Sequence, residues 1–354
     1  MIHIDIADDK WKELEEYHKQ YIEKTVIHNW EKFLNNSRID VNDKQLVEKI
    51  LEKHGIIIPK ENDAKKDQKL ETIFKWCVSD NIDELANITK DKLFQNTGVN
   101  DEEIKKRCIE NIISILGYYR FSEGAQHTKM KDGKTWCRHS FMNALGIKVC
   151  PYCNREYITS YYVSENRNKK VRTTTDTDHY YPKSYFPLLS MNIHNMVPSC
   201  SICNSRMKLN KVKCKEDAHL YPYRDASDSL IFEIPFSNIE ELYGFSEDDI
   251  NIQLKVMNQR NVSNRAEQSK KLFRLEETYE AHTDVVFKLL NNIRNYSSES
   301  YERIFRKNYT DIFGGYENFR KVLYPFLSED EKNTPLVKMQ KDIYKCINDK
   351  VDLP

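Results

Sequence analysis

The sequence predicts an α+β protein in which mostly helical flanks surround a central, zinc-bound module of two strands and a helix. Three observations lead to this class. Apolar side chains recur at helical spacing in the first 120 residues and again after residue 272. Threonine, tyrosine and valine, which favour strands, are frequent in residues 157–162 and 171–178. Two Cys-x-x-Cys pairs bracket these stretches and indicate a structural metal site.

Composition restricts the class of protein. At 354 residues the chain has room for two or three domains. Charged residues make up 31% of it and the mean hydropathy is −0.74, which favours a soluble, cytoplasmic protein. No apolar run approaches the roughly 20 residues that span a membrane. Charged residues follow Met1 closely, so a signal peptide is not expected.

The flanking regions, residues 1–135 and 221–354, are expected to be mainly helical. An apolar stripe at helical spacing predicts the first helix, through Trp11, Leu14, Tyr17 and Tyr21. Two later helices are predicted to end at Gly55 and Gly117, because glycine commonly terminates helices. In the second flank, two short strands are predicted over 230–236 and 250–256, followed by helical stretches over 272–293 and 336–347.

The central region, residues 136–220, is expected to hold the strands and the chemistry. Residues 157–162 and 171–178 are predicted as strands, and the second of them delivers His179. A short helix is predicted from Asn204 onward. The predicted order around the site is therefore strand, strand, helix.

Four of the nine cysteines stand in two close pairs, Cys150 with Cys153 and Cys200 with Cys203. Each Cys-x-x-Cys turn directs two sulfurs toward one metal ion, and two such turns complete a closed tetrahedral zinc site. The alternative is a redox-active dithiol, but the chain lacks the βαβ pattern typical of thioredoxins. Cys137 and Cys214 are alternative zinc ligands, although neither has a partner at this spacing.

Charge is unevenly distributed along a chain whose net charge is zero. From Lys148 to Lys215 there are twelve Lys and Arg against four Asp and Glu, a surplus of eight positive charges that the remainder of the chain offsets. A basic segment around the candidate site suits a polyphosphate partner such as nucleic acid. The alternative is a solvated loop surface.

The residues between the cysteine pairs form a more specific motif. The run Asp178–Ser184 (DHYYPKS) is followed by Asn195 and then by the run Cys203–Lys208 (CNSRMK). At these spacings the residues resemble the HNH endonucleases, a family with a ββα-metal fold that often carries four zinc-binding cysteines. The resemblance covers residues 150–215, about a fifth of the chain.

The resemblance implies a role for each motif residue. His179 would be the general base that takes a proton from the attacking water, and histidine suits this role because its pKa lies near neutral pH. Asp178 and Asn204 would hold one catalytic Mg²⁺ or Mn²⁺, and Asn195 would brace the loop and help to orient His179. The family often has histidine where this chain has Asn204, and asparagine favours a hard, oxygen-ligated metal.

Three cations flank the motif, Lys183, Arg206 and Lys208, and are candidates to bind phosphates of nucleic acid. The expected activity is hydrolysis of phosphodiester bonds, with DNA as the expected substrate. An RNA-cleaving toxin with the same site is an alternative, because nothing in the motif separates RNA from DNA. A non-catalytic zinc module that binds nucleic acid is another, although it leaves Asp178, His179 and Asn204 unexplained.

The C-terminal helical stretches carry a second resemblance. Residues 273–296 and 335–343 resemble the tails of HNH nucleases from bacterial anti-phage systems, of which Septu-type systems pair the nuclease with an ATPase. The chain has no Gly-x-x-x-x-Gly-Lys-Ser/Thr phosphate loop, so any ATPase is expected to be a separate chain. This resemblance implies a role in antiviral defence.

Overall fold

The computed structural model describes residues 1–351 apart from residues 124–128, 166–167, 258–261, 297–302, 305–307 and 309. The chain forms two compact units. The N-terminal unit comprises Asp5–Ile147 and Ile158–Ala218, and the C-terminal unit comprises Met1–Ile4, Lys148–Tyr157 and His219–Pro354. The sequence predicted a division into residues 1–135, 136–220 and 221–354. The two units do not test whether these three segments are separate domains, so that division stays a prediction.

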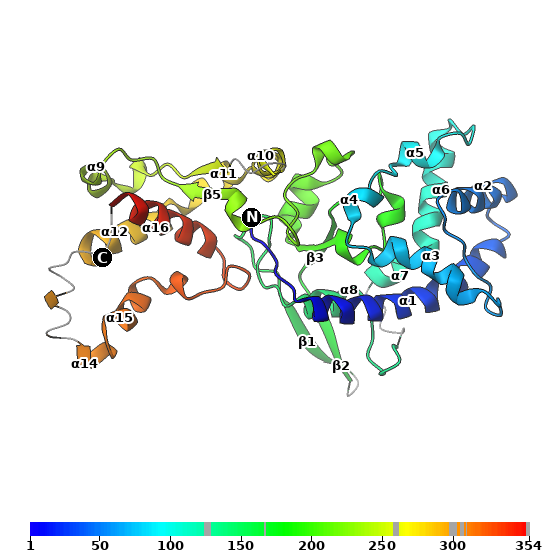
Figure 1. The fold of residues 1–354 in the computed structure, drawn as a ribbon, viewed down its shortest axis with the longest axis horizontal. Helices are drawn as coiled ribbons and strands as arrows, with labels where there is room; N and C mark the ends of the chain where they lie inside the picture. Colours follow the sequence, from blue (N-terminus) through cyan, green and yellow to red (C-terminus); the bar gives the residue numbers. More distant parts are fainter. Residues whose placement is uncertain are drawn as a thin grey trace. The chain divides into compact units, whose positions relative to one another are not determined.

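The N-terminal unit begins with a series of helices (Figure 1). They are α1 (Asp8–Leu34), α2 (Val41–Lys53), α3 (Lys66–Val78), α4 (Ile82–Leu85), α5 (Lys90–Phe94), α6 (Glu102–Ile115), α7 (Tyr118–Ser122) and α8 (Arg138–Leu145). Helix α1 contacts α3 and α6, and α2 contacts α6. Their shared core includes Tyr21, Ile73 and Ile112, each of which is almost fully buried.

Side chains at the helix ends explain where these helices start and stop. The Asp40 carboxylate accepts a hydrogen bond from the backbone N–H of Asn42 and starts α2. The Asp101 carboxylate starts α6 in the same way. Helix α6 is followed by Gly117, whose φ of 94° lies in the left-handed region that glycine adopts readily. The predicted helix ends at Gly55 and Gly117 are therefore confirmed to within a few residues.

The strands of the N-terminal unit pair in two antiparallel sheets of two strands each. They are β1 (Ser160–Glu165) with β2 (Asn168–Thr173), and β3 (Asp176–His179) with β4 (Met196–Ser199). The sequence predicted one strand over 171–178, but it is divided into β2 and β3. Thr174 lies in the break, where its backbone N–H donates to Thr159 at 2.9 Å.

Short helices complete the N-terminal unit: η1 (Pro187–Leu189), η2 (Ile193–Asn195), η3 (Ile202–Lys208) and η4 (Lys215–Asp217). The helix predicted from Asn204 onward is found as η3, which is a π-helix and starts two residues earlier. Its wide turn is completed by the Leu209 N–H, which donates to the Asn204 carbonyl five residues back at 3.0 Å. The strands beside η3 are β3, which contacts it, and β4, which pairs with β3. Strand β4 was not predicted from the sequence, and the strand predicted over 157–162 overlaps β1, which pairs with β2.

The C-terminal unit contains the predicted pair of strands and several helices. The elements are η5 (Ser227–Ser229), β5 (Leu230–Glu233), α9 (Ile239–Gly244), η6 (Glu247–Asp249), β6 (Gln253–Val256), α10 (Ser263–Leu272), α11 (Leu275–Tyr279), η7 (Glu280–His282), α12 (Thr283–Tyr296), α14 (Thr310–Phe313), α15 (Tyr316–Leu323), η8 (Pro325–Leu327) and α16 (Val337–Val351). The helical stretch predicted over 272–293 is interrupted because Arg274 adopts a left-handed φ of 44°.

The architecture is thus mixed, with many helices and small antiparallel sheets, in agreement with the predicted α+β class. Within the described part of the chain, no helix combines the length and apolar composition that spanning a membrane requires.

Candidate functional site

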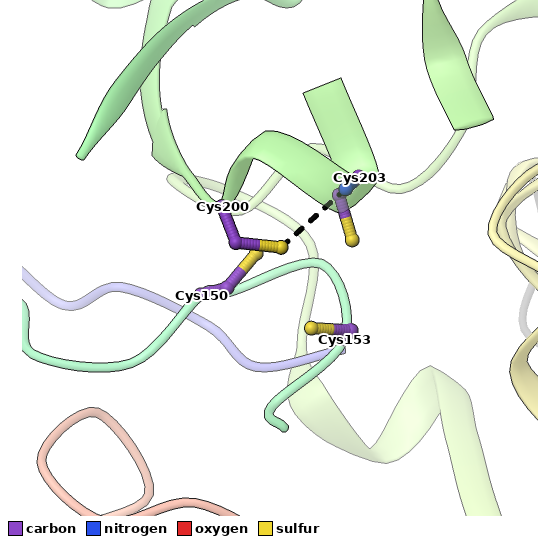
Figure 2. A group of neighbouring side chains, drawn as sticks. All are labelled: Cys150, Cys153, Cys200 and Cys203. Carbon is purple, nitrogen blue, oxygen red and sulfur yellow. Dashed lines mark hydrogen bonds between the residues drawn. The ribbon is translucent and has the colours of Figure 1, made fainter. Parts of the chain in front are cut away.

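The four paired cysteines lie together in one cluster (Figure 2). The sulfur atoms of Cys150, Cys153, Cys200 and Cys203 all lie within 4.8 Å of one another, and all four residues are buried. In a tetrahedral site with Zn–S bonds of about 2.3 Å, the sulfurs are about 3.8 Å apart, so this arrangement could hold a zinc ion. The prediction that these four cysteines form one set is therefore confirmed.

The remaining cysteines lie outside this cluster, including the two alternative ligands Cys137 and Cys214. Burial raises the pKa of the Cys77 and Cys108 thiols to about 12. A thiol with so high a pKa stays protonated at neutral pH and is a poor nucleophile and a poor metal ligand. These two side chains therefore serve as packing groups.

The first Cys-x-x-Cys turn is held by residues far along the sequence. The Tyr279 hydroxyl donates to the Cys153 carbonyl at 2.6 Å. Asn154, in the left-handed conformation, donates from its amide to the Glu331 carbonyl at 2.8 Å and accepts from the Lys338 N–H at 3.1 Å. These supporting residues were not predicted, because amide and hydroxyl contacts with backbone leave no spacing pattern in the sequence.

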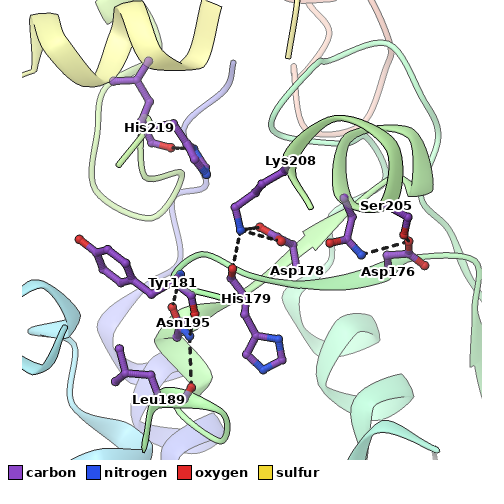
Figure 3. A network of polar contacts seen from close by, with 11 residues as sticks. Asp176, Asp178, His179, Tyr181, Leu189, Asn195, Ser205, Lys208 and His219 are labelled. Atoms are coloured by element: carbon purple, nitrogen blue, oxygen red, sulfur yellow. Dashed lines mark hydrogen bonds and ion pairs between the residues drawn. The ribbon is translucent and has the colours of Figure 1, made fainter. Parts of the chain in front are cut away.

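Asp178 and Lys208 form a buried ion pair beside strand β3 (Figure 3). The Lys208 ammonium lies 2.8 Å from each Asp178 carboxylate oxygen and also donates to the His179 carbonyl. Burial lowers the pKa of Lys208, while the Asp178 carboxylate opposes that change. The role of Lys208 as a phosphate ligand stays a prediction from the sequence, and its ammonium is fully buried and bonded to Asp178 and the His179 carbonyl.

His179 is the last residue of β3, and its ring is held from two sides. Its Nε2 lies 2.9 Å from the Ser190 carbonyl, which can only accept, so Nε2 carries the proton. The lone pair is then on Nδ1, for which no partner is found among the described residues. The Tyr118 ring packs against the imidazole with the centroids 5.1 Å apart.

The imidazole of His179 is neutral at physiological pH. Burial is the largest cause that lowers the pKa of His179 to about 3, and the positive charge of Lys183 acts in the same direction. This pKa lies well below the near-neutral value on which the sequence-based assignment of His179 as a base relied. The unprotonated ring keeps a lone pair that can accept a proton, but it is a weak base unless a nearby negative charge stabilises the imidazolium.

Asn195 ties together the loop between β3 and β4. Its side-chain oxygen accepts from the Tyr181 N–H at 2.8 Å, and its amide donates to the carbonyls of Tyr181 and Leu189 at 3.0 and 3.1 Å (Figure 3). It is fully buried. Because Ser190 follows Leu189, Asn195 fixes the loop that supplies the acceptor for His179.

Asn204 lies on η3, and its side chain contacts Asp176, the first residue of β3. Its amide donates to Asp176 at 3.2 Å, and the Ser205 hydroxyl donates to the same carboxylate oxygen at 3.3 Å. Asp176 thus connects η3 to β3, a contact consistent with their neighbouring positions in Figure 3.

A cavity of about 620 Å³ opens at this site. Asp178, His179 and Asn204 line it, so the residues assigned to catalysis and to a hard metal reach one space. Lys183 also lines it, and Arg206 is exposed but is not among the lining residues. The cavity is also lined by residues of α6 and by Tyr118, the residue that starts α7.

Comparison with family models, with curated proteins and with solved structures found no match to this chain. The similarity to HNH endonucleases therefore rests on the motif residues themselves, and the function has to be argued from their geometry.

Proposed function

We propose that this chain is a metal-dependent endonuclease of the HNH type that hydrolyses phosphodiester bonds in DNA. One observation carries the proposal: His179 lines the same cavity as Asp178 and Asn204, with Nε2 bound to the Ser190 carbonyl and the lone pair of Nδ1 available. The basic surplus of residues 148–215 supports a polyanionic substrate.

In the proposed reaction, Nδ1 of His179 accepts a proton from a water molecule as the water oxygen attacks phosphorus. The bond from phosphorus to the leaving oxygen breaks, and that oxygen is protonated from solvent. The negative charge of a bound phosphodiester raises the pKa of His179, since it stabilises the imidazolium that forms. The Ser190 carbonyl keeps the ring in the tautomer that presents Nδ1.

Asp178 and Asn204 are the residues that would hold Mg²⁺ or Mn²⁺. Their side chains offer carboxylate and amide oxygens, the donors that these ions prefer, and both line the cavity. A divalent ion at Asp178 would compete with the Lys208 ammonium for the carboxylate oxygens. When bound, such an ion neutralises charge on the phosphate and on the leaving oxygen. Zinc at the four cysteines would have a structural role.

Cleavage of supercoiled plasmid tests the proposal. The protein is depleted of weakly bound metal without loss of zinc, and Mg²⁺ or Mn²⁺ is then added back. Nicked or linear plasmid that forms only after the addition supports a metal-dependent DNA endonuclease. Cleavage of RNA alone would favour the toxin alternative. Binding of DNA without cleavage of either substrate would favour a non-catalytic zinc module.

We propose further that the nuclease acts in the cytoplasm in anti-phage defence, with a separate ATPase chain as its partner. The support is the similarity of residues 273–296 and 335–343 to the tails of defence nucleases. The test is phage plating on a bacterial host that expresses the chain with an ATPase encoded beside it. We expect fewer plaques on the host that expresses the wild-type chain than on the host that expresses His179→Ala. Equal plaque counts on the two hosts would contradict a defence role.

A further inference from the structure

The imidazole of His179 needs more than one contact to be fixed. The hydrogen bond from Nε2 to Ser190 holds one corner of the ring at 2.9 Å. A ring held at its tip still pivots about the line from Cβ to that tip, and such a rotation would swing Nδ1 away from a bound water. A group packed against the ring is required to remove this freedom.

Tyr118 is one group that packs against the buried ring. Its ring lies 5.1 Å from the imidazole centroid at an interplanar angle of 61°, an edge-to-face arrangement. The Lys183 ammonium lies 4.9 Å from the centroid of the same tyrosine ring, a cation–π distance. One aromatic side chain therefore contacts both the proposed base and a cation that lines the cavity.

Close packing of the N-terminal helices restricts the position of Tyr118. Gly117 separates α6 from α7, and its carbonyl accepts from the buried Tyr21 hydroxyl at 2.9 Å. A Cβ at Gly117 would lie 3.0 Å from the Thr25 hydroxyl oxygen, so the turn is closely packed against α1. Tyr118 is the first residue of α7, and this turn directs it to the cavity.

We propose that Tyr118 is a positioning residue for His179, and that it acts through its ring and not through its hydroxyl. The inference rests on the proposed nuclease function. Among the residues that the structure describes, the Tyr118 hydroxyl has no hydrogen-bond partner. Phenylalanine should therefore replace tyrosine with little loss, whereas leucine, which has no ring, should let the imidazole pivot.

The experiment compares Tyr118→Phe, Tyr118→Leu and the control Tyr161→Leu, which changes an exposed tyrosine on β1 outside the cavity. Misplacement of a catalytic group by about 1 Å costs roughly 10²-fold in rate. We expect Tyr118→Leu to lower kcat by about 10- to 100-fold with a much smaller change in KM. Tyr118→Phe and the control should stay within about twofold of wild type.

A second measurement does not depend on catalysis. Diethyl pyrocarbonate modifies accessible neutral imidazoles, and mass spectrometry reports the rate at His179. Tyr118→Leu should raise this rate severalfold at unchanged zinc content, and Tyr118→Phe should not.

If Tyr118→Leu has the same kcat and the same rate of His179 modification as wild type, the inference is overturned, although the nuclease assignment stands. Loss of activity in Tyr118→Phe equal to that in Tyr118→Leu would also overturn it, because the hydroxyl would then be the important group. If the wild-type protein cleaves neither DNA nor RNA, the proposed function fails, and the modification rates still decide whether Tyr118 positions His179.

Discussion

The cysteine cluster and the cavity at His179 are both marked by short motifs, yet they depend on the rest of the chain to different degrees. The four sulfurs that define the cluster all belong to the two Cys-x-x-Cys pairs. At the cavity, residues of α6 and the start of α7 complete the lining, and His18 of α1 bonds to the Met191 carbonyl in the loop beside it. A four-cysteine cluster of this kind can thus be predicted from residue spacing, whereas the lining of the cavity depends on the tertiary fold.

The largest effect is expected at the cluster. Cys200→Ser removes one of the four clustered sulfurs, which are the proposed zinc ligands. Structural zinc contributes about 10–16 kcal/mol of apparent binding energy in small zinc domains. The variant should lose its zinc and its cooperative thermal transition. Metal analysis and thermal unfolding measure both. Cys214→Ser is the matched control, since Cys214 lies outside the cluster, and it should retain zinc. Full zinc content in Cys200→Ser would show that Cys200 is not a ligand.

The next effect tests the ion pair that links η3 to β3. Lys208→Met leaves the buried Asp178 carboxylate without its ammonium partner and should lower the free energy of unfolding by about 3–5 kcal/mol. Lys211→Met, at an exposed position, should change it by less than about 0.5 kcal/mol. Urea unfolding gives both values. Equal stability of the two variants would mean that the pair contributes nothing.

The pH dependence of stability tests the support that α1 gives to the cavity. His18 donates from Nε2 to the Met191 carbonyl at 2.7 Å, next to Ser190, and accepts from the Trp136 indole N–H at 3.2 Å. Burial lowers the pKa of His18 to about 4. The unfolded chain, with a histidine pKa of about 6.5, therefore binds more protons between these values, and stability should fall as the pH drops from about 6.5 to about 4.

Urea unfolding at several pH values would measure this slope. His18→Leu should reduce it, although the variant also loses two hydrogen bonds and is expected to be less stable at pH 7.5. An unchanged slope in the variant would assign the pH dependence to other buried histidines, such as His139, whose pKa burial also lowers to about 4.

The smallest effect is expected at the exposed cation of η3. Arg206→Ala should weaken DNA binding severalfold and reduce the slope of log affinity against log salt by about 0.9, the value for one phosphate contact. Binding measured at several salt concentrations gives this slope. If the slope of log affinity against log salt is the same for wild type and Arg206→Ala, then Arg206 does not contact a phosphate.

The sequence supported some of these features better than others. Local patterns were sufficient for the helix ends at Gly55 and Gly117 and for the strands near residues 230 and 253, because each depends on neighbouring residues. The four-cysteine set was predicted although its two pairs are about 50 positions apart, because each Cys-x-x-Cys pair is itself a recognisable local motif. The ion pair of Lys208, the ring of Tyr118 and the break at Arg274 were not predicted. The first two join residues 30 and 61 positions apart, and the third is a single backbone torsion.

The central claim is that Nδ1 of His179 is the base of a nuclease, and the rate of DNA cleavage by His179→Ala tests it most directly. A positioned base contributes about 10²–10⁴ in rate. With zinc content and thermal unfolding equal to wild type, the variant should lose at least about a hundredfold in the rate of plasmid nicking with Mg²⁺ or Mn²⁺ present. A folded, zinc-loaded His179→Ala that nicks plasmid at the wild-type rate would contradict the account.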